Sequence, residues 1–255
     1  MVTTGRPGGN GRYSEVIDLS NERNQCDNLE NFPYEVLGAA GTYLNGNIIV
    51  CGNYWGTNKD KCYFLGQNKY ITMSENRALF SGIIVGDKVR DQLLMIIAYF
   101  LLCSSLWGYM RWFQFFCTLF QFWVTGGYGS SPSTDLIDEH GSTPGVELPR
   151  YFGEHCMTYM NGTHGIILGG GSGNGHKTLM VVLSNFQFTE GPLMNVYRAE
   201  HACSYFHAPN GTNYVIVAGG GSASDKTEIL NVNDVELGWY YGKKYEINVQ
   251  SMKWC

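Results

Sequence analysis

The stretch from Gly169 to Thr178 has the residue types closest to a known site chemistry. It reads Gly-Gly-Gly-Ser-Gly-Asn-Gly-His-Lys-Thr, and glycine-rich loops can hold phosphate groups through their backbone N–H groups. A phosphate loop needs Gly-Lys-Ser/Thr in direct succession and a helix after it. Here His176 separates glycine from lysine, and the Leu-Met-Val-Val that follows is typical of a strand. We therefore interpret the stretch as a turn between strands.

Glutamate–histidine pairs occur twice, as Glu154-His155 and Glu200-His201. Metal binding requires a third ligand that converges on the same point, and the sequence identifies none. Repetition of the pair favours a structural role, so no metal or cofactor is predicted. No Ser-His-Asp set, nucleophile elbow or catalytic carboxylate pair can be assigned either. We expect that the protein is not an enzyme.

The chain has eight cysteines, and none forms a C-x-x-C pair that would indicate zinc. Cys51 and Cys62 flank one turn on adjacent antiparallel strands, which predicts a cross-strand disulfide if the protein is secreted. Cys156 and Cys203 occupy matching strands of neighbouring repeats, offset by one position. We interpret these two as buried thiols.

Two Asn-Gly-Thr sequences begin at Asn161 and Asn210. Each is an acceptor sequence for N-glycosylation, and each is also a typical hairpin turn. Both interpretations stay open for both asparagines.

The formal net charge is −5, and lysine and arginine are scattered. Because no basic stripe is present, nucleic acid is not an expected partner. No signal peptide is visible at the start of the sequence. The cysteines favour an extracellular location, with a cytoplasmic location as the alternative.

A repeated unit organises the elements that must position these residues. Each unit has a β-branched run that ends in glycine, then a polar turn and a second β-run. The glycine-ending runs are Val2–Gly5, Ile48–Gly52, Phe122–Gly127, Ile166–Gly171 and Val215–Gly221. Their first glycines are 47, 74, 43 and 50 residues apart, so only the second spacing is irregular.

Glycine is expected after each run because the turn requires positive φ and a close approach between neighbouring units. The glycines assigned to these turns are Gly5, Gly52, Gly126, Gly127, Gly169, Gly170, Gly219 and Gly220.

The repeat resembles the kelch repeat, in which about 50 residues form one four-stranded blade of a β-propeller. More closely, it resembles the secreted kelch-like proteins of arthropods. The matching segments are Val2–Gly9, Glu15–Ser20, Val50–Gly52, Lys61–Tyr63, Gly153–Met157 and Thr189–Pro192.

The resemblance implies an all-β kelch propeller over residues 2–240, with about five recognisable blades and an atypical tail at 241–255. Only five glycine-ending runs are present and the fifth unit fades after Trp239, so the ring is either incomplete or closed by an atypical route. The implied function is binding of a protein or glycan partner by one propeller face. The alternatives are a copper enzyme of the galactose-oxidase type and a cytosolic kelch adaptor.

An apolar segment interrupts the repeats. Residues 93–110 carry no charge and are long enough to span a membrane, but one span would separate earlier blades from later ones. Removing 89–121 reduces the irregular spacing to 41 residues. We therefore predict an apolar insertion at 89–121, helical and exposed. Val89-Arg90 and Gln121 can be encoded by typical intron ends, so we interpret the segment as a translated retained intron or gene-model artefact. A genuine insertion and a membrane anchor are the alternatives, and transcript sequencing tests the interpretation.

Overall fold

The fold is seen in a computed structural model. It describes residues 32–34, 36, 38–54, 56–86, 120–127, 132–171, 173–220 and 225–242, together with the backbone of three N-terminal strands. These residues form β-strands and one short 3-10 helix, η2 (Val235–Leu237).

Four of the sheets in the described structure have four antiparallel strands each. The first contains β4 (Ala40–Leu44), β5 (Asn47–Cys51), β6 (Lys61–Phe64) and β7 (Lys69–Thr72). The second contains β8 (Ser81–Gly86), β9 (Phe120–Thr125), β10 (Thr134–Ile137) and β11 (Ser142–Pro144). The third contains β12 (Cys156–Asn161), β13 (His164–Leu168), β14 (Thr178–Val182) and β15 (Gln187–Glu190). The fourth contains β16 (Ala202–His207), β17 (Asn213–Ala218), β18 (Thr227–Asn231) and β19 (Trp239–Tyr241).

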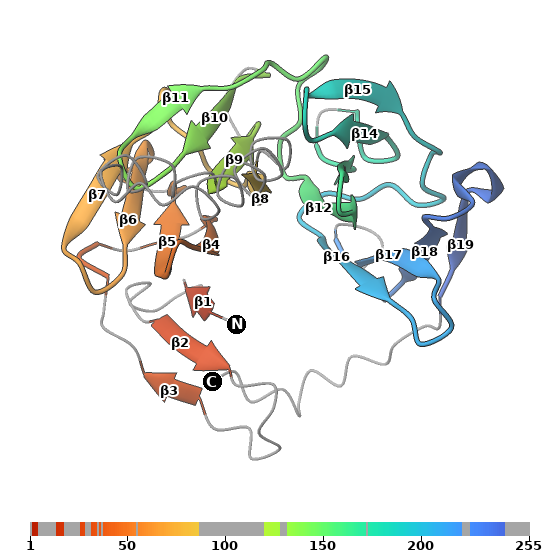
Figure 1. Ribbon diagram of the computed structural model, residues 1–255, viewed down its shortest axis with the longest axis horizontal. Coiled ribbons are helices and arrows are strands. Elements are labelled where there is room, and N and C mark those ends of the chain that lie inside the picture. Colours follow the sequence, from red (N-terminus) through yellow and green to blue (C-terminus); the bar gives the residue numbers. More distant parts are fainter. Residues whose placement is uncertain are drawn as a thin grey trace, which may run out of the picture.

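A fifth sheet at the N-terminus has three strands, β1 (Val2–Thr4), β2 (Ser14–Ile17) and β3 (Cys26–Asn28). In every sheet, consecutive strands are hydrogen-bonded neighbours. The sheets surround a common centre, with β4, β8, β12 and β16 inside and β7, β11, β15 and β19 outside (Figure 1). This arrangement is compatible with a β-propeller.

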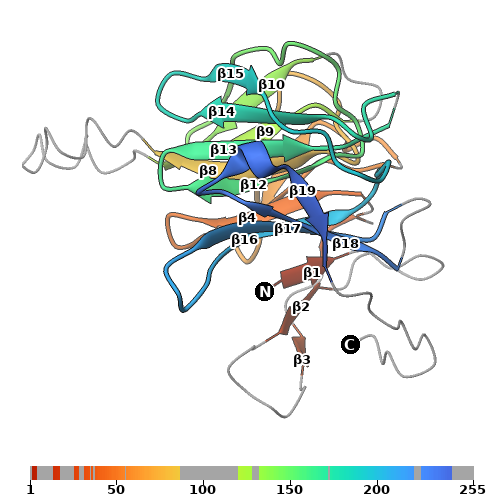
Figure 2. The ribbon, with the colours of Figure 1, turned by 90° about the vertical axis from the view of Figure 1, so that its right-hand side faces the viewer.

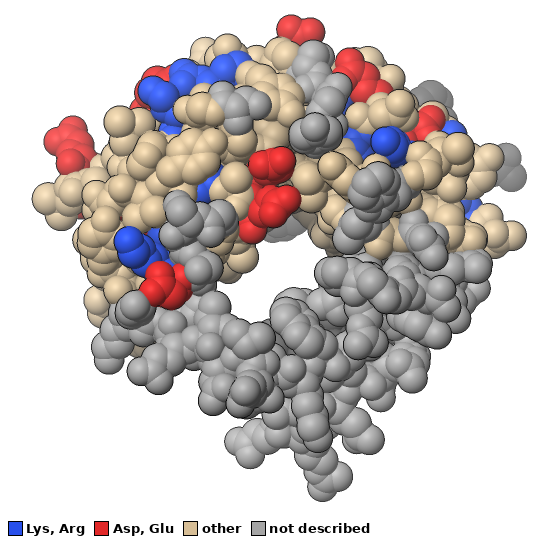
Figure 3. Space-filling model, turned by 180° about the vertical axis from the view of Figure 1, so that it is seen from behind, with Lys and Arg blue, Asp and Glu red and all other residues tan. Residues whose placement is uncertain are grey.

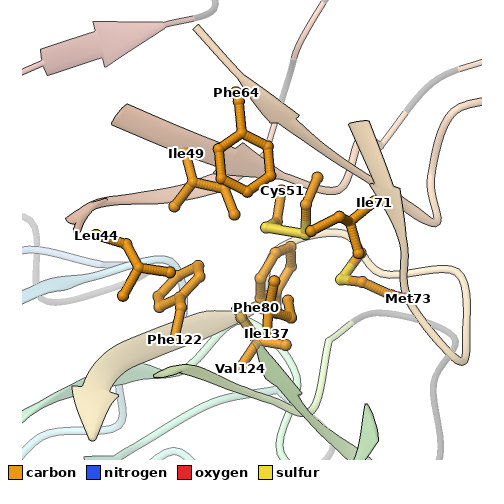
Figure 4. Packing of buried hydrophobic residues seen from close by; sticks show 11 residues of the cluster. Leu44, Ile49, Cys51, Phe64, Ile71, Met73, Phe80, Phe122, Val124 and Ile137 are labelled. Carbon is orange, nitrogen blue, oxygen red and sulfur yellow. A yellow bond between two sulfur atoms is a disulfide. The ribbon is translucent and has the colours of Figure 1, made fainter. Parts of the chain in front are cut away.

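The hydrophobic core lies between successive sheets. Figure 4 shows the cluster between the first two, where Ile49 and Phe64 face Phe122 and Val124. Because both faces of a middle sheet are covered, consecutive residues of one strand are all buried, as Phe122, Trp123 and Val124 are. That explains why the repeats read as continuous apolar runs rather than as alternating ones.

The predicted glycine-ending runs overlap β5, β9, β13 and β17, and the second β-run of each of these units corresponds to β6, β10, β14 or β18. All the predicted turn glycines except Gly5 have positive φ; Gly5 lies outside the described residues. A Cβ at Gly126 or Gly169 would overlap the backbone carbonyl oxygen of Phe152 or Arg198 on the connection to the next sheet. Glycine therefore permits the close approach between sheets.

The predicted apolar insertion falls between β8 and β9. Residues 87–119 lie outside the described residues, so its helical character stays a prediction. Phe120 and Gln121, which the prediction places in the insertion, begin β9 and pair with Gly86 and Val85. In the part of the chain that is described, no helix is long and apolar enough to cross a membrane.

Candidate binding face

The sheets have two ends with different kinds of loop. The turns after β5, β9, β13 and β17, and the connections leading to β8, β12 and β16, lie at one end, which we call the glycine-loop face. The turns β4–β5, β12–β13 and β16–β17 lie at the other end, the hairpin face. Figure 2 shows the two ends on opposite sides of the ring.

Each glycine loop is tied to the next sheet through one repeated position, which we call the joint position. It holds Val36, Arg77, Phe152 and Arg198 in successive sheets. The backbone carbonyls of the last three accept hydrogen bonds from the preceding glycine loop, namely from the amides of Asn53 (3.0 Å), Gly127 (2.9 Å) and Gly170 (2.8 Å).

Two joint positions are ionic. Arg77 donates to Asp135 Oδ2 from Nε (3.0 Å) and Nη2 (2.7 Å), and its Nη1 donates to the carbonyl of Gly126 at 2.7 Å. Arg198 repeats this arrangement with Glu228 Oε1. All four charged side chains are fully buried. A buried ion pair of this kind is tolerated only when hydrogen bonds satisfy its remaining polar atoms, and here backbone carbonyls do so.

The other two joint positions are apolar. Phe152 packs with Leu179 in the core between β8–β11 and β12–β15. Val36 packs with Tyr63 beside the first sheet. Leu179 and Tyr63 each pair with the residue two before the first turn glycine, the register position that Asp135 and Glu228 take in the other two sheets. Ionic and apolar joints therefore alternate along the four described four-stranded sheets.

Two residues beyond each joint position, the backbone adopts positive φ. These residues are Gly38, Leu79, Glu154 and Glu200, with φ of 64°, 52°, 59° and 55°. They form a chain of backbone hydrogen bonds between sheets: Leu79 N donates to Gly38 O (2.7 Å), Glu154 N to Leu79 O (2.8 Å), and Glu200 N to Glu154 O (2.8 Å). This chain fixes the inner rim of the glycine-loop face.

The rim brings two carboxylates together. Burial and the neighbouring charge of Glu200 raise the pKa of the Glu154 carboxyl. Glu200 itself is exposed. Figure 3 shows acidic side chains gathered beside the central hollow on this face. Positive φ is unfavourable for a non-glycine residue. The rim nevertheless holds glutamate at two positions where glycine would be less strained.

The two histidines beside these glutamates point into the protein rather than onto the face. His155 is buried, and its Nε2 lies 2.8 Å from Thr125 Oγ1. Burial lowers the pKa of His155 to about 3, helped by the charges of His201 and Arg77. Burial also lowers the pKa of His201 to about 4, helped by the charge of Arg198. Both rings are therefore neutral at pH 7, and the described residues contain no His, Cys, Asp and Glu cluster that could hold a metal.

Exposed aromatic and apolar side chains lie farther out on the glycine-loop face. Tyr197 packs over Gly175 and makes an edge contact with the His176 ring at 5.7 Å between centroids. Leu193, on the same connection, is 58% exposed. The neighbouring loop is fixed by a hydrogen bond from Asn174 Nδ2 to the Tyr151 carbonyl (2.6 Å). The face therefore combines carboxylates at its rim with exposed apolar side chains farther out.

The stretch from Gly169 to Thr178 is a turn followed by a strand, as predicted. Lys177 N donates to the Asn174 carbonyl at 2.8 Å, and Thr178 begins β14. No helix follows, so the N–H groups that a phosphate loop needs are not assembled there.

Two disulfides lie among the residues that the structure describes. One joins Cys51 and Cys62, directly opposite each other on β5 and β6. The other joins Cys156 on β12 to Cys203 on β16, with their Cα atoms 5.9 Å apart. The interpretation of Cys156 and Cys203 as thiols was wrong. Their offset by one position is what turns the two side chains toward each other across neighbouring sheets.

The two predicted glycosylation acceptors both lie on the hairpin face. Asn161 ends β12, and its Oδ1 accepts from the amide and hydroxyl of Thr163 at 2.9 Å. Asn210 is exposed in the loop between β16 and β17. Their modification stays a prediction, and glycans there would leave the glycine-loop face free.

Sequence reasoning missed the joint positions, although the signal was present. An arginine on the connection and an acid at the second residue of the third strand recur as Arg77 with Asp135 and Arg198 with Glu228. No protein-family model matches the chain, and no curated protein matches it.

Proposed function

We propose that this chain is a non-catalytic kelch-type propeller that binds a protein partner through its glycine-loop face. The observation that carries the proposal is the rim pair of Glu154 and Glu200. Both backbones sit at positive φ and are linked by a hydrogen bond. Two carboxylates held side by side favour a partner that brings lysine or arginine side chains.

The exposed apolar groups around the rim suit a protein partner. Leu193 and Tyr197 lie on the connection that ends at Glu200. Protein interfaces combine aromatic anchors with a polar and charged surround. The two disulfides favour an oxidising, extracellular environment for this interaction.

An unbiased pull-down with the intact protein, followed by titration of the recovered partner, tests this function. The E154Q–E200Q variant removes both rim charges, and E139Q–E236Q removes two charges from the hairpin face. We expect the rim variant to weaken binding at least about tenfold, near 1.4 kcal/mol, and the control to bind as the parent does. Equal binding by all three proteins contradicts the proposed face.

The copper-enzyme alternative makes a different prediction. Metal analysis of protein purified after copper loading, with an assay for oxidation of primary alcohols, discriminates between the two. If the protein binds stoichiometric copper and turns over the alcohol, it is an enzyme and the proposed binding function is wrong.

A further inference from the structure

A buried ring closes three of the connections over the glycine loop of the preceding sheet. It lies three residues beyond the joint positions Arg77, Phe152 and Arg198, and we call its place the ring position. The rings are those of Phe80, His155 and His201, each at most 9% exposed. They lie close to the turn glycines Gly52, Gly126 and Gly169, in that order. Two of the three rings can therefore bind a proton, and the third cannot.

The ring of His155 has a polar partner on one side only. Its Nε2 lies 2.8 Å from Thr125 Oγ1, whereas its Nδ1 has no partner at hydrogen-bond geometry among the described residues. The charged or titratable groups that face it are Arg77, which is paired with Asp135, and His201. A proton on this ring would therefore add a positive charge and an unpaired N–H donor to the protein interior, which is costly.

The ring of His201 has less polar support. Leu168 ends its strand where Thr125 ends the equivalent strand one sheet earlier, so no hydroxyl is supplied from this place. Neither ring nitrogen of His201 has a partner at hydrogen-bond geometry in the described part of the chain. The neighbouring charges are those of Arg198 and Glu228, which pair with each other. Both histidines are therefore held in surroundings that suit a neutral ring.

Acid acts on the closed connections through these two rings. Burial is the largest cause of both lowered pKa values, about 3 for His155 and about 4 for His201. The nearby carbonyls of Phe152 and Leu168 raise these pKa values but offset only part of the effect of burial. An opened connection exposes the ring to water, where its pKa is about 6.5. The open state then binds more protons, so the closed state loses stability as the pH falls below about 7.

One carboxylate beside these rings acts in the opposite direction. Burial and the charge of Glu200 raise the pKa of the Glu154 carboxyl. The closed state therefore binds this proton more readily than the open state does, and at this group acid favours closure. A comparison of variants at the ring positions cancels the contribution, because Glu154 is the same in all of them.

We infer that His155 and His201 are pH sensors of the glycine-loop face: a proton on either ring favours opening of the connection that carries it, whereas Phe80 keeps its own connection closed at the same pH. The opening is local, because the Cys156–Cys203 disulfide lies directly beyond the two histidines and joins β12 to β16. The connection to β16 also carries exposed apolar groups of the proposed binding face. Loss of that face in acid rests on the proposed function, whereas the opening itself does not.

Amide hydrogen exchange of the full chain, measured by NMR at pH 7 and pH 5 and expressed as protection relative to the unfolded chain, tests this inference. One amide reports on each connection because it donates to the joint carbonyl. Asn53, Gly127 and Gly170 donate to Arg77, Phe152 and Arg198, respectively. Between pH 7 and pH 5 we expect the protection of Gly127 and Gly170 to fall about 20-fold, the effect of one proton per connection. That of Asn53 should change less than about twofold, because Phe80 does not titrate.

Variants that copy Phe80 into the other two ring positions identify the group that titrates. We expect H201F to abolish the fall in protection at Gly170 and to leave the fall at Gly127 unchanged. H155F should have the reverse effect, so each variant is the matched control for the other. In the parent protein, the amides of β13 should stay more protected than Gly170 at both pH values, because they are released only by a larger unfolding event.

Three results would overturn the inference. The first is an equal fall in protection at Asn53 and Gly170 in the parent protein, which needs no variant and so holds even if a variant does not fold. The second is an unchanged pH dependence at Gly170 in H201F. The third is equal protection of Gly170 and of β13 at pH 5, because both would then exchange only through global unfolding.

Discussion

The connection leading to β8 and the connection leading to β12 solve the same packing problem with opposite chemistry. At the first, Arg77 and Asp135 form a buried, fully hydrogen-bonded ion pair. At the second, Phe152 and Leu179 pack as apolar side chains. In both, the joint carbonyl accepts a hydrogen bond from the preceding glycine loop.

The difference shows which features the fold requires. The backbone contact and the glycine before it are present at both connections, whereas the side-chain chemistry changes. An ion pair also fixes loop carbonyls that an apolar pair does not touch, because Arg77 reaches both Gly126 and Ser133. The ionic joints should therefore be more sensitive to loss of one partner.

The largest expected effect is that of breaking one ionic joint. R77L leaves Asp135 charged and buried without its partner, which typically costs about 3–5 kcal/mol. Urea unfolding measures this loss. R150L is the matched control, because the Arg150–Glu190 pair is partly exposed and should contribute at most about 1 kcal/mol. Similar losses for both variants contradict a special role for the joint.

The next largest effect is the loss of stability when a disulfide is removed, which should be greater for the bridge between sheets than for the bridge within a sheet. The Cys156–Cys203 bridge spans 47 residues and the Cys51–Cys62 bridge spans 11. Loop-closure entropy predicts a loss of about 4 kcal/mol for C156S–C203S and about 3 kcal/mol for C51S–C62S. Thermal and urea unfolding of both double variants test this order, and the reverse order counts against an inter-sheet tie.

A smaller effect is the loss of folding stability at acidic pH. His155 and His201 have pKa values lowered to about 3 and about 4 in the folded protein, against about 6.5 when unfolded. The unfolded state therefore binds more protons below pH 6.5, and stability falls as the pH falls. When the pH is lowered from 7 to 5, each histidine should therefore lower the free energy of unfolding by about 2 kcal/mol.

His201→Leu isolates one of these contributions. Between pH 7 and pH 5, this variant should lose about 2 kcal/mol less than the parent protein. Urea unfolding at the two pH values gives the comparison. An unchanged pH dependence would show that His201 is not held neutral in the folded protein.

Much of the strand pattern could be predicted from the sequence, because the glycine-ending runs repeat what the backbone requires. Gly52, Gly126 and Gly169 were found in this way, as was the facing of Cys51 and Cys62. The pairing depends on a short turn, so local spacing was enough.

The parts that were missed depend on contacts between sheets. Arg77 and Asp135 are 58 residues apart, and nothing local distinguishes them from a surface arginine and a surface acid. Cys156 and Cys203 were placed on the correct strands, but spacing alone does not say that offset side chains on neighbouring sheets meet. The rim carboxylates required the positive-φ position to be known first.

The smallest expected effect is also the most direct test that ionic and apolar joints occupy one repeated position. The double variant R77F–D135L copies the Phe152 and Leu179 joint into the second sheet. Replacement of a buried ion pair by apolar residues of similar volume is often nearly neutral, so urea unfolding should place the double variant within about 2 kcal/mol of the parent. R77F alone should lose about 3–5 kcal/mol. A double variant that is as unstable as R77F would contradict the equivalence of the joints.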